Sequence, residues 1–209
     1  VVLSDSTHGD ISHFALVTVR ITDSDGVEGM GSTYTVGNIG GSAIASLLRD
    51  DIVPVLRELP GIVRDAEGKP LASAEVVVIT ELKRGTGAQR ADVNVSLRGV
   101  EPAGLKLRPE VKLVEGRWFT PGLREIAVGK SAANQFEGVK LGSVLRFRGS
   151  EWTVVGTFAA DGDAHESELW TDADTARSAF GRGNSASSIV AQMESAAAIE
   201  QITATAKAD

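Results

Sequence analysis

The stretch from Val111 to Gly129, VKLVEGRWFTPGLREIAVG, constrains the fold of this chain more than any other part of it. It predicts a strand that ends at Gly116 and a second strand from Arg124 to Val128. Between them lies a wide aromatic turn that contains Trp118 and Phe119. The stretch therefore predicts a strand, a turn and a second strand that leads into a helix.

The composition limits which classes of protein fit this chain. Its 209 residues, 42% of them apolar, suffice for one or two small domains with buried cores. The net charge of -7 argues against a nucleic-acid partner, because phosphate binding depends on clustered basic residues. The chain has no cysteine, which excludes disulfides and thiolate zinc sites. No apolar run reaches the roughly 18 residues that a membrane helix requires, so we expect no membrane span here.

The N-terminal part predicts a β-hairpin followed by a helix. Residues Ile11 to Thr22 alternate between apolar and polar side chains, and Val27 to Tyr34 reads as the returning strand. The Asp25-Gly26 pair between them is typical of a tight hairpin turn. A helix is predicted from Ala43 to Leu59, with Pro54 kinking or splitting it.

The pattern changes at Pro60-Gly61 to short strands separated by turns. The predicted strands and helices of this larger part are Ile62–Arg64, Ala74–Leu82, Val93–Arg98, a helix at Lys130–Phe136, a hairpin across Gly149-Ser150, a helix capped by Thr171 or Asp172 and ending at Phe180, a strand at Ser188–Met193 and a helix at Ser195–Lys207. Strands and helices mix without a regular βαβ order, which favours an α+β fold with short strands, hairpins and a few helices. We expect two unlike parts, residues 1–59 and 60–209, joined near Pro60.

Residues of the larger part resemble a family of transporter domains. The segments VEGRWFTPGLREIAVGKSAANQF, EWTVVGTF and HESELWTDAD, within about residues 60–209, resemble the MacB-like periplasmic core domain of FtsX-type ABC transporter permeases. In that family the domain is inserted between the first two membrane helices and lies outside the cytoplasmic membrane. The resemblance implies contacts with permease helices and partner proteins, and it implies no active site and no cofactor. The chain is expected to stop before the C-terminal end of the family's domain.

Residues of about 3–58 resemble a different family. The segments LSDSTHG, HFALVTVRITDSDGVEGMGSTYTVG and GGSAIASLL are similar to the N-terminal capping domain of the mandelate racemase and muconate lactonizing branch of the enolase superfamily. That resemblance implies substrate-facing cap positions at His8, Tyr34, Thr35 and Val36, and a cytoplasmic parent enzyme. The family's metal ligands and bases lie on a barrel, and no barrel-like βα repeat follows here.

Two motifs that could carry chemistry fail on spacing. VGKSA at Val128 to Ala132 follows a strand as a phosphate loop would, but a phosphate loop needs glycine where Arg124 stands. The acidic loop DGDAHESE departs from calcium-loop order, so a solvated turn is the alternative to a metal site. No catalytic, cofactor-binding or metal-binding residue is therefore assigned, and Trp118 and Phe119 become candidates for partner contact.

The sequence thus favours a non-catalytic extracytoplasmic permease domain that acts through protein contacts and binds no nucleotide directly. The alternative is a fragment of a mandelate racemase-like enzyme, an acid sugar dehydratase or racemase, that lacks its catalytic barrel. A natural gene fusion and an engineered chimera both remain open explanations of the two parts.

Overall fold

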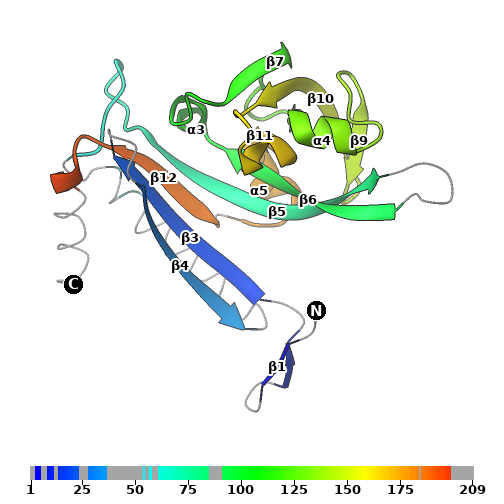
Figure 1. The fold of residues 1–209 in the computed structure, drawn as a ribbon, viewed down its shortest axis with the longest axis horizontal. Coiled ribbons are helices and arrows are strands. Elements are labelled where there is room, and N and C mark those ends of the chain that lie inside the picture. Colours follow the sequence, from blue (N-terminus) through cyan, green and yellow to red (C-terminus); the bar gives the residue numbers. More distant parts are fainter. Residues whose placement is uncertain are drawn as a thin grey trace. The chain divides into compact units, whose positions relative to one another are not determined.

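The computed structural model describes residues 3–5, 9–11, 14–23, 28–36, 54, 57, 61–84, 91–183 and 185–198. The chain forms two compact units (Figure 1). Unit 1 comprises Val1–Ala74 and Asn184–Asp209, and unit 2 comprises Glu75–Gly183. The predicted junction at Pro60 between the two sequence parts stays a prediction.

Unit 1 contains the predicted N-terminal hairpin. Strands β3 (Phe14–Asp23) and β4 (Glu28–Val36) pair antiparallel, from Phe14 opposite Val36 to Thr22 opposite Glu28, which confirms the hairpin. The predicted Asp25-Gly26 turn lies outside the described residues. Two shorter strands, β1 (Leu3–Asp5) and β2 (Gly9–Ile11), also pair antiparallel.

A strand from the other end of the chain completes unit 1. Strand β12 (Ser188–Met193) has the predicted bounds and pairs in parallel with β3, through Val190 opposite Arg20 to Met193 opposite Asp23. The N-terminal hairpin therefore gains its third strand from a segment close to the C-terminus. Ile62 and Met193 form a bridge and belong to one apolar cluster with Ala72, Ala191 and Ala198.

The other segments predicted for unit 1 are a strand and two helices. The strand predicted at 62–64 is wrong, because Ile62 and Arg64 form only isolated bridges. The Asp65 carboxylate accepts backbone N–H bonds from Glu67 and Lys69, and this turn ends the extended segment. Of the helix predicted at Ala43–Leu59, Pro54 and Arg57 are helical and the rest lies outside the described residues. The same is true of the C-terminal helix beyond Ala198.

Unit 2 contains a mixed sheet in the strand order β5-β6-β11-β8-β10-β7, with β9 also paired to β10. The bounds are β5 Ala72–Arg84, which begins in unit 1, β6 Ala91–Val100, β7 Lys112–Gly116, β8 Glu125–Gly129, β9 Val144–Phe147, β10 Ser150–Ala159 and β11 Leu169–Asp172. The β6–β11 and β8–β10 pairs are parallel, and β5–β6, β11–β8, β10–β7 and β10–β9 are antiparallel. This mixed order confirms the α+β class.

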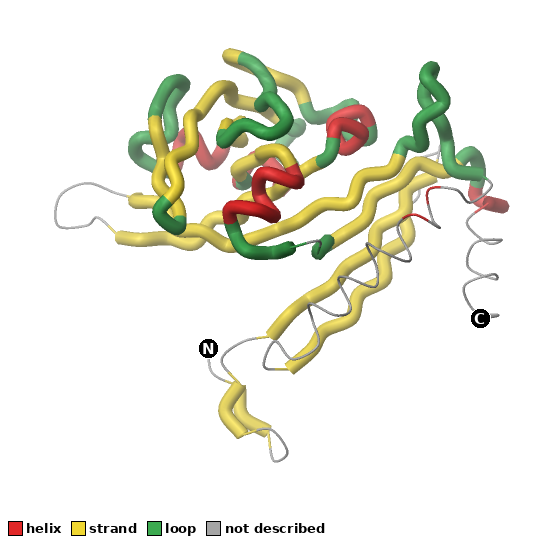
Figure 2. The backbone as a smooth tube through the Cα atoms, turned by 180° about the vertical axis from the view of Figure 1, so that it is seen from behind, coloured by secondary structure: helices red, strands yellow, loops and turns green. Residues whose placement is uncertain are grey.

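Short helical segments accompany these strands in the described part of unit 2 (Figure 2). They are α3 (Pro102–Lys106), α4 (Lys130–Gln135), the 3₁₀ turn η3 (Ala164–Ser167) and α5 (Ala173–Ala179). The predicted helix at 130–136 is confirmed. The cap of the next helix is Asp172, whose carboxylate accepts from Thr175 N at 2.9 Å and from Thr175 Oγ1 at 2.7 Å.

The β9–β10 hairpin is confirmed, with its turn one residue earlier than predicted. Arg148 and Gly149 occupy the turn with φ values of 47° and 74°. Two consecutive positive φ angles are typical of the type I′ turn, whose twist matches that of paired strands. Ser150 consequently begins β10 instead of belonging to the turn.

Strand β10 contributes to both apolar clusters of unit 2. Trp152 and Val154 are buried in the larger cluster, while Phe158 is buried in the second. The register of β10 shifts against β8 between Val154 and Gly156 and against β7 between Thr157 and Phe158. Such irregularities change the direction of the side chains that follow. Burying an apolar side chain of this size contributes about 1.5–3 kcal/mol, so β10 stabilises both clusters.

Candidate functional site

The Val111–Gly129 stretch forms two strands that do not pair with each other, because β10 lies between them. The turn that joins them is closed by an ion pair between Arg117 and Glu125. Arg117 Nη1 donates to Glu125 Oε2 at 2.7 Å, and the Thr120 backbone N–H donates to the same oxygen at 2.9 Å. The bond from Arg117 and that from Thr120 hold the pKa of Glu125 at about 2.

The aromatic residues of this turn pack inward. The Trp118 ring lies 5.8 Å from Phe158 and 6.4 Å from Trp170, centroid to centroid. Trp118 is half-buried, whereas Phe119 is 8% exposed. Trp118 is therefore the more accessible member of the predicted contact pair, and the contact role of both residues remains a proposal.

A buried ionic network lies next to these rings. Glu75 is fully buried and accepts from Arg108 Nη1 at 2.6 Å and from Arg108 Nη2 at 2.9 Å. Arg98 Nη1 donates to Glu75 at 3.0 Å, and Arg98 also donates to both oxygens of Glu168 at 2.7 Å. Two carboxylates and two guanidinium groups thus neutralise one another within the fold.

Trp170 joins the ionic network to the aromatic cluster. Its indole Nε1 donates to Glu168 Oε2 at 2.8 Å, and the Arg108 guanidinium lies 5.4 Å from its ring centroid. Burial opposes the charge of Glu168, but the bonds from Arg98 outweigh it and lower the pKa of Glu168. Burial likewise opposes the charge of Arg98, and Glu168 and Glu75 together raise its pKa. Both groups stay charged, so the network has the character of a structural anchor.

The carboxylates of the acidic loop DGDAHESE have separate partners and do not converge on one point. The Glu166 carboxylate accepts from the backbone N–H groups of Ala160 at 2.9 Å and Gly162 at 3.2 Å, which lower its pKa. Glu168 pairs with Arg98, and Asp163 lies 3.3 Å from His165 Nδ1. Among the described residues, no group of three His, Asp or Glu side chains is placed to hold a metal ion.

The VGKSA segment has no room for a phosphate. A Cβ on Gly129 would lie 2.2 Å from the carbonyl oxygen of Glu166. Ser131 Oγ donates to the Glu166 carboxylate at 3.2 Å, so a protein anion already lies at the start of α4. The segment is a close strand-to-helix turn packed on η3.

The four cap positions implied by the N-terminal resemblance are only partly placed. Tyr34, Thr35 and Val36 are consecutive on β4, opposite Leu16, Ala15 and Phe14 of β3. His8 lies outside the described residues. A substrate-facing role for these four residues remains a proposal.

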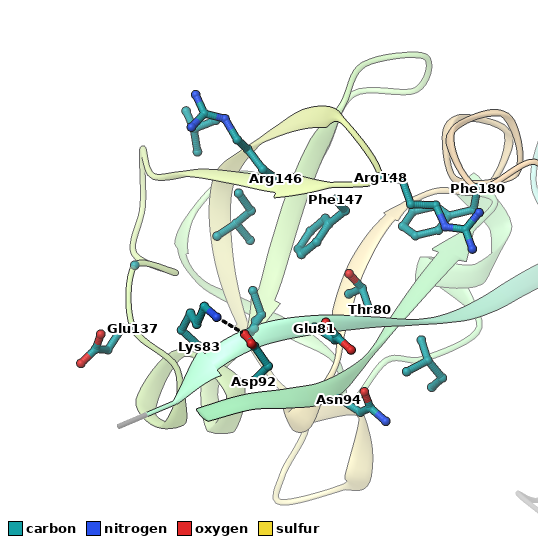
Figure 3. Close-up of a pocket in the computed structure, with 15 residues that line it drawn as sticks. Thr80, Glu81, Lys83, Asp92, Asn94, Glu137, Arg146, Phe147, Arg148 and Phe180 are labelled. Carbon is teal, nitrogen blue, oxygen red and sulfur yellow. Dashed lines mark ion pairs between the residues drawn. The ribbon is translucent and has the colours of Figure 1, made fainter. Parts of the chain in front are cut away.

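Unit 2 also contains a groove of about 890 Å³ between β5 and β9 (Figure 3). Its rim carries three acidic and three basic side chains, Glu81, Asp92, Glu137, Lys83, Arg146 and Arg148. The Leu145, Phe147 and Phe180 side chains that line it are at most 7% exposed and belong to the larger apolar cluster. It is therefore a depression with an apolar floor and a rim of balanced charge.

The sequence does not predict this groove or the ionic network. Glu75 lies inside the β-branched run AEVVVITEL, which the pattern marks as buried. A buried carboxylate needs a cationic or hydrogen-bonding partner, so this residue is the signal that could have indicated an ion pair. Its partners Arg98 and Arg108 are 23 and 33 residues away in the chain, so they could not be chosen without the pairing of β5 with β6.

Comparison with known proteins agrees with both resemblances. The family described as the MacB-like periplasmic core domain matches residues 9–209, which extends the match well beyond the 60–209 range expected from the motifs. The N-terminal part is also similar to the 3,6-anhydro-alpha-L-galactonate cycloisomerase of Streptomyces coelicolor (strain ATCC BAA-471 / A3(2) / M145). That similarity is 56% identity over 50 residues, which is 24% of this chain and only 14% of the enzyme.

Two solved structures share the fold. The extracellular domain of the noncanonic ABC-type transporter YknZ from Gram-positive bacteria has a TM-score of 0.54 at 19% identity, over 73% of this chain and 76% of that one. The periplasmic region of MacB from Actinobacillus actinomycetemcomitans has a TM-score of 0.55 at 15% identity, over 77% of this chain and 73% of that one. At these identities the likeness concerns the fold alone. None of the helices described in this chain is long and apolar enough to cross a membrane.

Proposed function

The chain belongs to the family of MacB-like periplasmic core domains, and we propose that it works by contacting other proteins outside the cytoplasmic membrane, without catalysing a reaction. Domains of this family are found in ABC transporter permeases. The nearest partners of this chain would therefore be the membrane helices of its own permease. Further partner proteins would bind its exposed surface.

The observation that carries this proposal is the family match along residues 9–209, which takes in both compact units. The described polar groups are consistent with it. Glu75, Arg98, Arg108 and Glu168 neutralise one another in the interior, where a substrate would have to displace a full set of charge-assisted bonds. Such a network stabilises a shape, and a stable shape is what a contact domain presents to its partners.

The similarity to the cycloisomerase supports a second candidate. Residues of the N-terminal part would then derive from an enzyme cap, with the junction at Pro60, and the chain would be a fusion or chimera. An enzyme of that class needs the remainder of its chain, since the match covers 14% of it. In this chain the cap-like hairpin pairs with β12 within unit 1, so it would serve as a sheet element.

Thermal unfolding separates the two candidates. A protein that binds a ligand in its native state gains stability with ligand concentration. We expect the melting temperature of the chain to stay constant when Mg²⁺ and 3,6-anhydrogalactonate are added together. A rise in melting temperature that depends on both additions would contradict the contact-domain proposal and support a retained enzyme-type site.

A further inference from the structure

The groove between β5 and β9 is lined by backbone groups of both strands, and those that point away from the paired neighbours can be identified. Strand β12 is the neighbour of β5 at the start of β5, in unit 1, so the groove concerns the later part of β5. Among the strands that the structure describes, β10 is the one that pairs with β9. Its hairpin has a two-residue turn, so Phe147 and Ser150 beside the turn exchange both of their backbone hydrogen bonds. Bonded and non-bonded pairs alternate along an antiparallel ladder, and therefore Arg146 and Val144 direct their N–H and C=O groups away from β10.

Another bond agrees with this assignment. Val154 N donates to the Ser143 carbonyl at 2.9 Å, which places the next bonded position two residues before Leu145. The backbone groups of Ser143, Leu145 and Phe147 thus all point toward β10. Val144 and Arg146 lie between these positions and are both exposed.

Strand β5 presents the same arrangement toward the groove. The Lys83 carbonyl accepts from Glu137 N at 3.1 Å, so it points away from β6. By the same alternation, Glu81 and Ile79 direct their N–H and C=O groups outward. The Ile79 side chain is 59% exposed. Outside the paired strands, the backbone bonds of the described residues include none to Ile79, Glu81, Val144 or Arg146.

The floor between these edges is apolar. Thr80 and Leu82 of β5 and Leu145 and Phe147 of β9 point into it and are each at most 9% exposed. Figure 3 shows Phe147 between the two strands. A chain lying along the groove would therefore place alternate side chains on apolar surface.

We propose that this groove binds an extended segment of a partner protein, which adds as a strand between β5 and β9. This inference rests on the proposed contact function and names the surface and the chemistry of the contact. The bound segment carries apolar or β-branched residues at alternate positions, facing the floor, and polar residues at the others. Its own N–H and C=O groups pair with Val144 and Arg146 on one side and with Ile79 and Glu81 on the other.

Two features favour a polypeptide strand over other ligands. The rim has equal numbers of acidic and basic side chains, so it has no excess charge to select an anion or a nucleic acid. A strand also carries N–H and C=O groups on both edges at a rise of about 3.3 Å per residue, which matches the alternation of both β5 and β9.

The test uses the full chain and a displayed library of random peptides about ten residues long. Selected peptides are synthesised and their dissociation constants measured by calorimetry. We expect enriched sequences with apolar residues at alternate positions. Methylating the backbone nitrogens of alternate residues should weaken binding at least about tenfold, because it removes donors from one edge of the added strand.

Matched substitutions on the protein locate the binding edge. Arg146→Pro removes the outward N–H of β9 and obstructs an added strand, at an edge position that tolerates proline. Arg146→Ala removes the same side chain and keeps the N–H. We expect Arg146→Pro to lose binding by about tenfold or more and Arg146→Ala to bind as the parent does. Thermal melts of both variants verify that the fold is retained, and the methylated peptides provide the same test without any substitution.

Other outcomes overturn the proposal. Absence of any enriched peptide, equal binding by Arg146→Pro and Arg146→Ala, or indifference to backbone methylation would each refute strand addition. A concentration-dependent dimer that Arg146→Pro abolishes would assign the groove to a second copy. Outward N–H groups of Val144 and Arg146 that are protected from hydrogen exchange in the free monomer would assign it to this chain's own residues. In none of these cases is a contact through Trp118 excluded, so the proposed function would stand.

Discussion

Glu75 and Arg108 form a bidentate ion pair in the interior of unit 2, with Nη1 to Oε1 at 2.6 Å and Nη2 to Oε2 at 2.9 Å. The pair connects strand β5 to the segment that follows α3, two parts of the chain that are distant in sequence. Because both side chains are shielded from water, removing one would leave the other charge buried without a partner. The stability of unit 2 therefore depends on this contact more than on any ion pair at its surface.

The first prediction concerns the buried carboxylate. Glu75→Gln should lower the free energy of unfolding by about 3–5 kcal/mol, because it leaves Arg108 and Arg98 without their shared anion. Urea denaturation of the full chain measures the loss. Glu151→Gln is the matched control, since Glu151 pairs with Arg146 at a surface where both side chains are more than half exposed. That control should lose less than about 1 kcal/mol, and equal losses in the two variants would contradict the structural role of the network.

The second prediction concerns acid stability. Glu125 has a folded-state pKa of about 2, below its ordinary value of 4.5, so its ionised form favours folding. This contribution is fully present above about pH 4.5 and is lost as the pH falls through the folded pKa. We expect the melting temperature of the parent to fall more steeply than that of Glu125→Gln between about pH 5 and pH 2.5. Parallel curves would show that the bonds from Arg117 and Thr120 do not stabilise the fold.

The third prediction concerns the turn into α4. Gly129→Ala should destabilise the fold by more than about 2 kcal/mol, because its Cβ would overlap the Glu166 carbonyl at 2.2 Å. Gly142→Ala is the control, since Gly142 has a positive φ of 81° and open space around its Cβ position. It should cost only about 1–2 kcal/mol for the left-handed backbone. A harmless Gly129→Ala would mean that η3 does not pack on this turn.

The fourth prediction concerns the N-terminal part. Residues 1–59 expressed alone should show no cooperative unfolding transition, because a two-stranded hairpin needs further strands or a packing partner for stability. In unit 1 that third strand is β12, from the other end of the chain. Circular dichroism during heating gives the answer. A sharp transition from the isolated segment would make it an independent domain with a boundary at Pro60.

Local patterns predicted much of this fold. The alternation in β10, the β-branched run of β5 and the Asp172 cap each depend on neighbouring residues alone, and each is confirmed. What local patterns could not predict is pairing between distant segments. Strand β10 separates β7 from β8, and β12 joins β3, although nothing in the intervening sequence marks either contact. The sequence singled out Trp118 but not the Arg108 and Trp170 contact next to it, since long-range pairing alone brings those side chains together.

The site was less predictable than the fold because it has no chemical motif. A groove between two strand edges consists of backbone groups, which every residue carries. Ile79 and Val144 are ordinary strand residues in the sequence, and only the strand order shows that their outward edges line one groove. By contrast, the exclusion of a phosphate loop followed from Arg124 alone, and the closeness of Gly129 to Glu166 supplies a second reason.

The most direct test of the contact function is photo-crosslinking in living cells, with the chain carried in the ABC transporter permease that we propose as its parent. A photoreactive phenylalanine analogue replaces Trp118, which is half-buried, or Val144 at the groove, and Trp152, which is fully buried, serves as the control position. We predict that Trp118 or Val144 gives a crosslink to one defined protein outside the cytoplasmic membrane, and that Trp152 gives none. Crosslinks that are absent from both Trp118 and Val144, or equal to those from Trp152, would contradict a function based on protein contact.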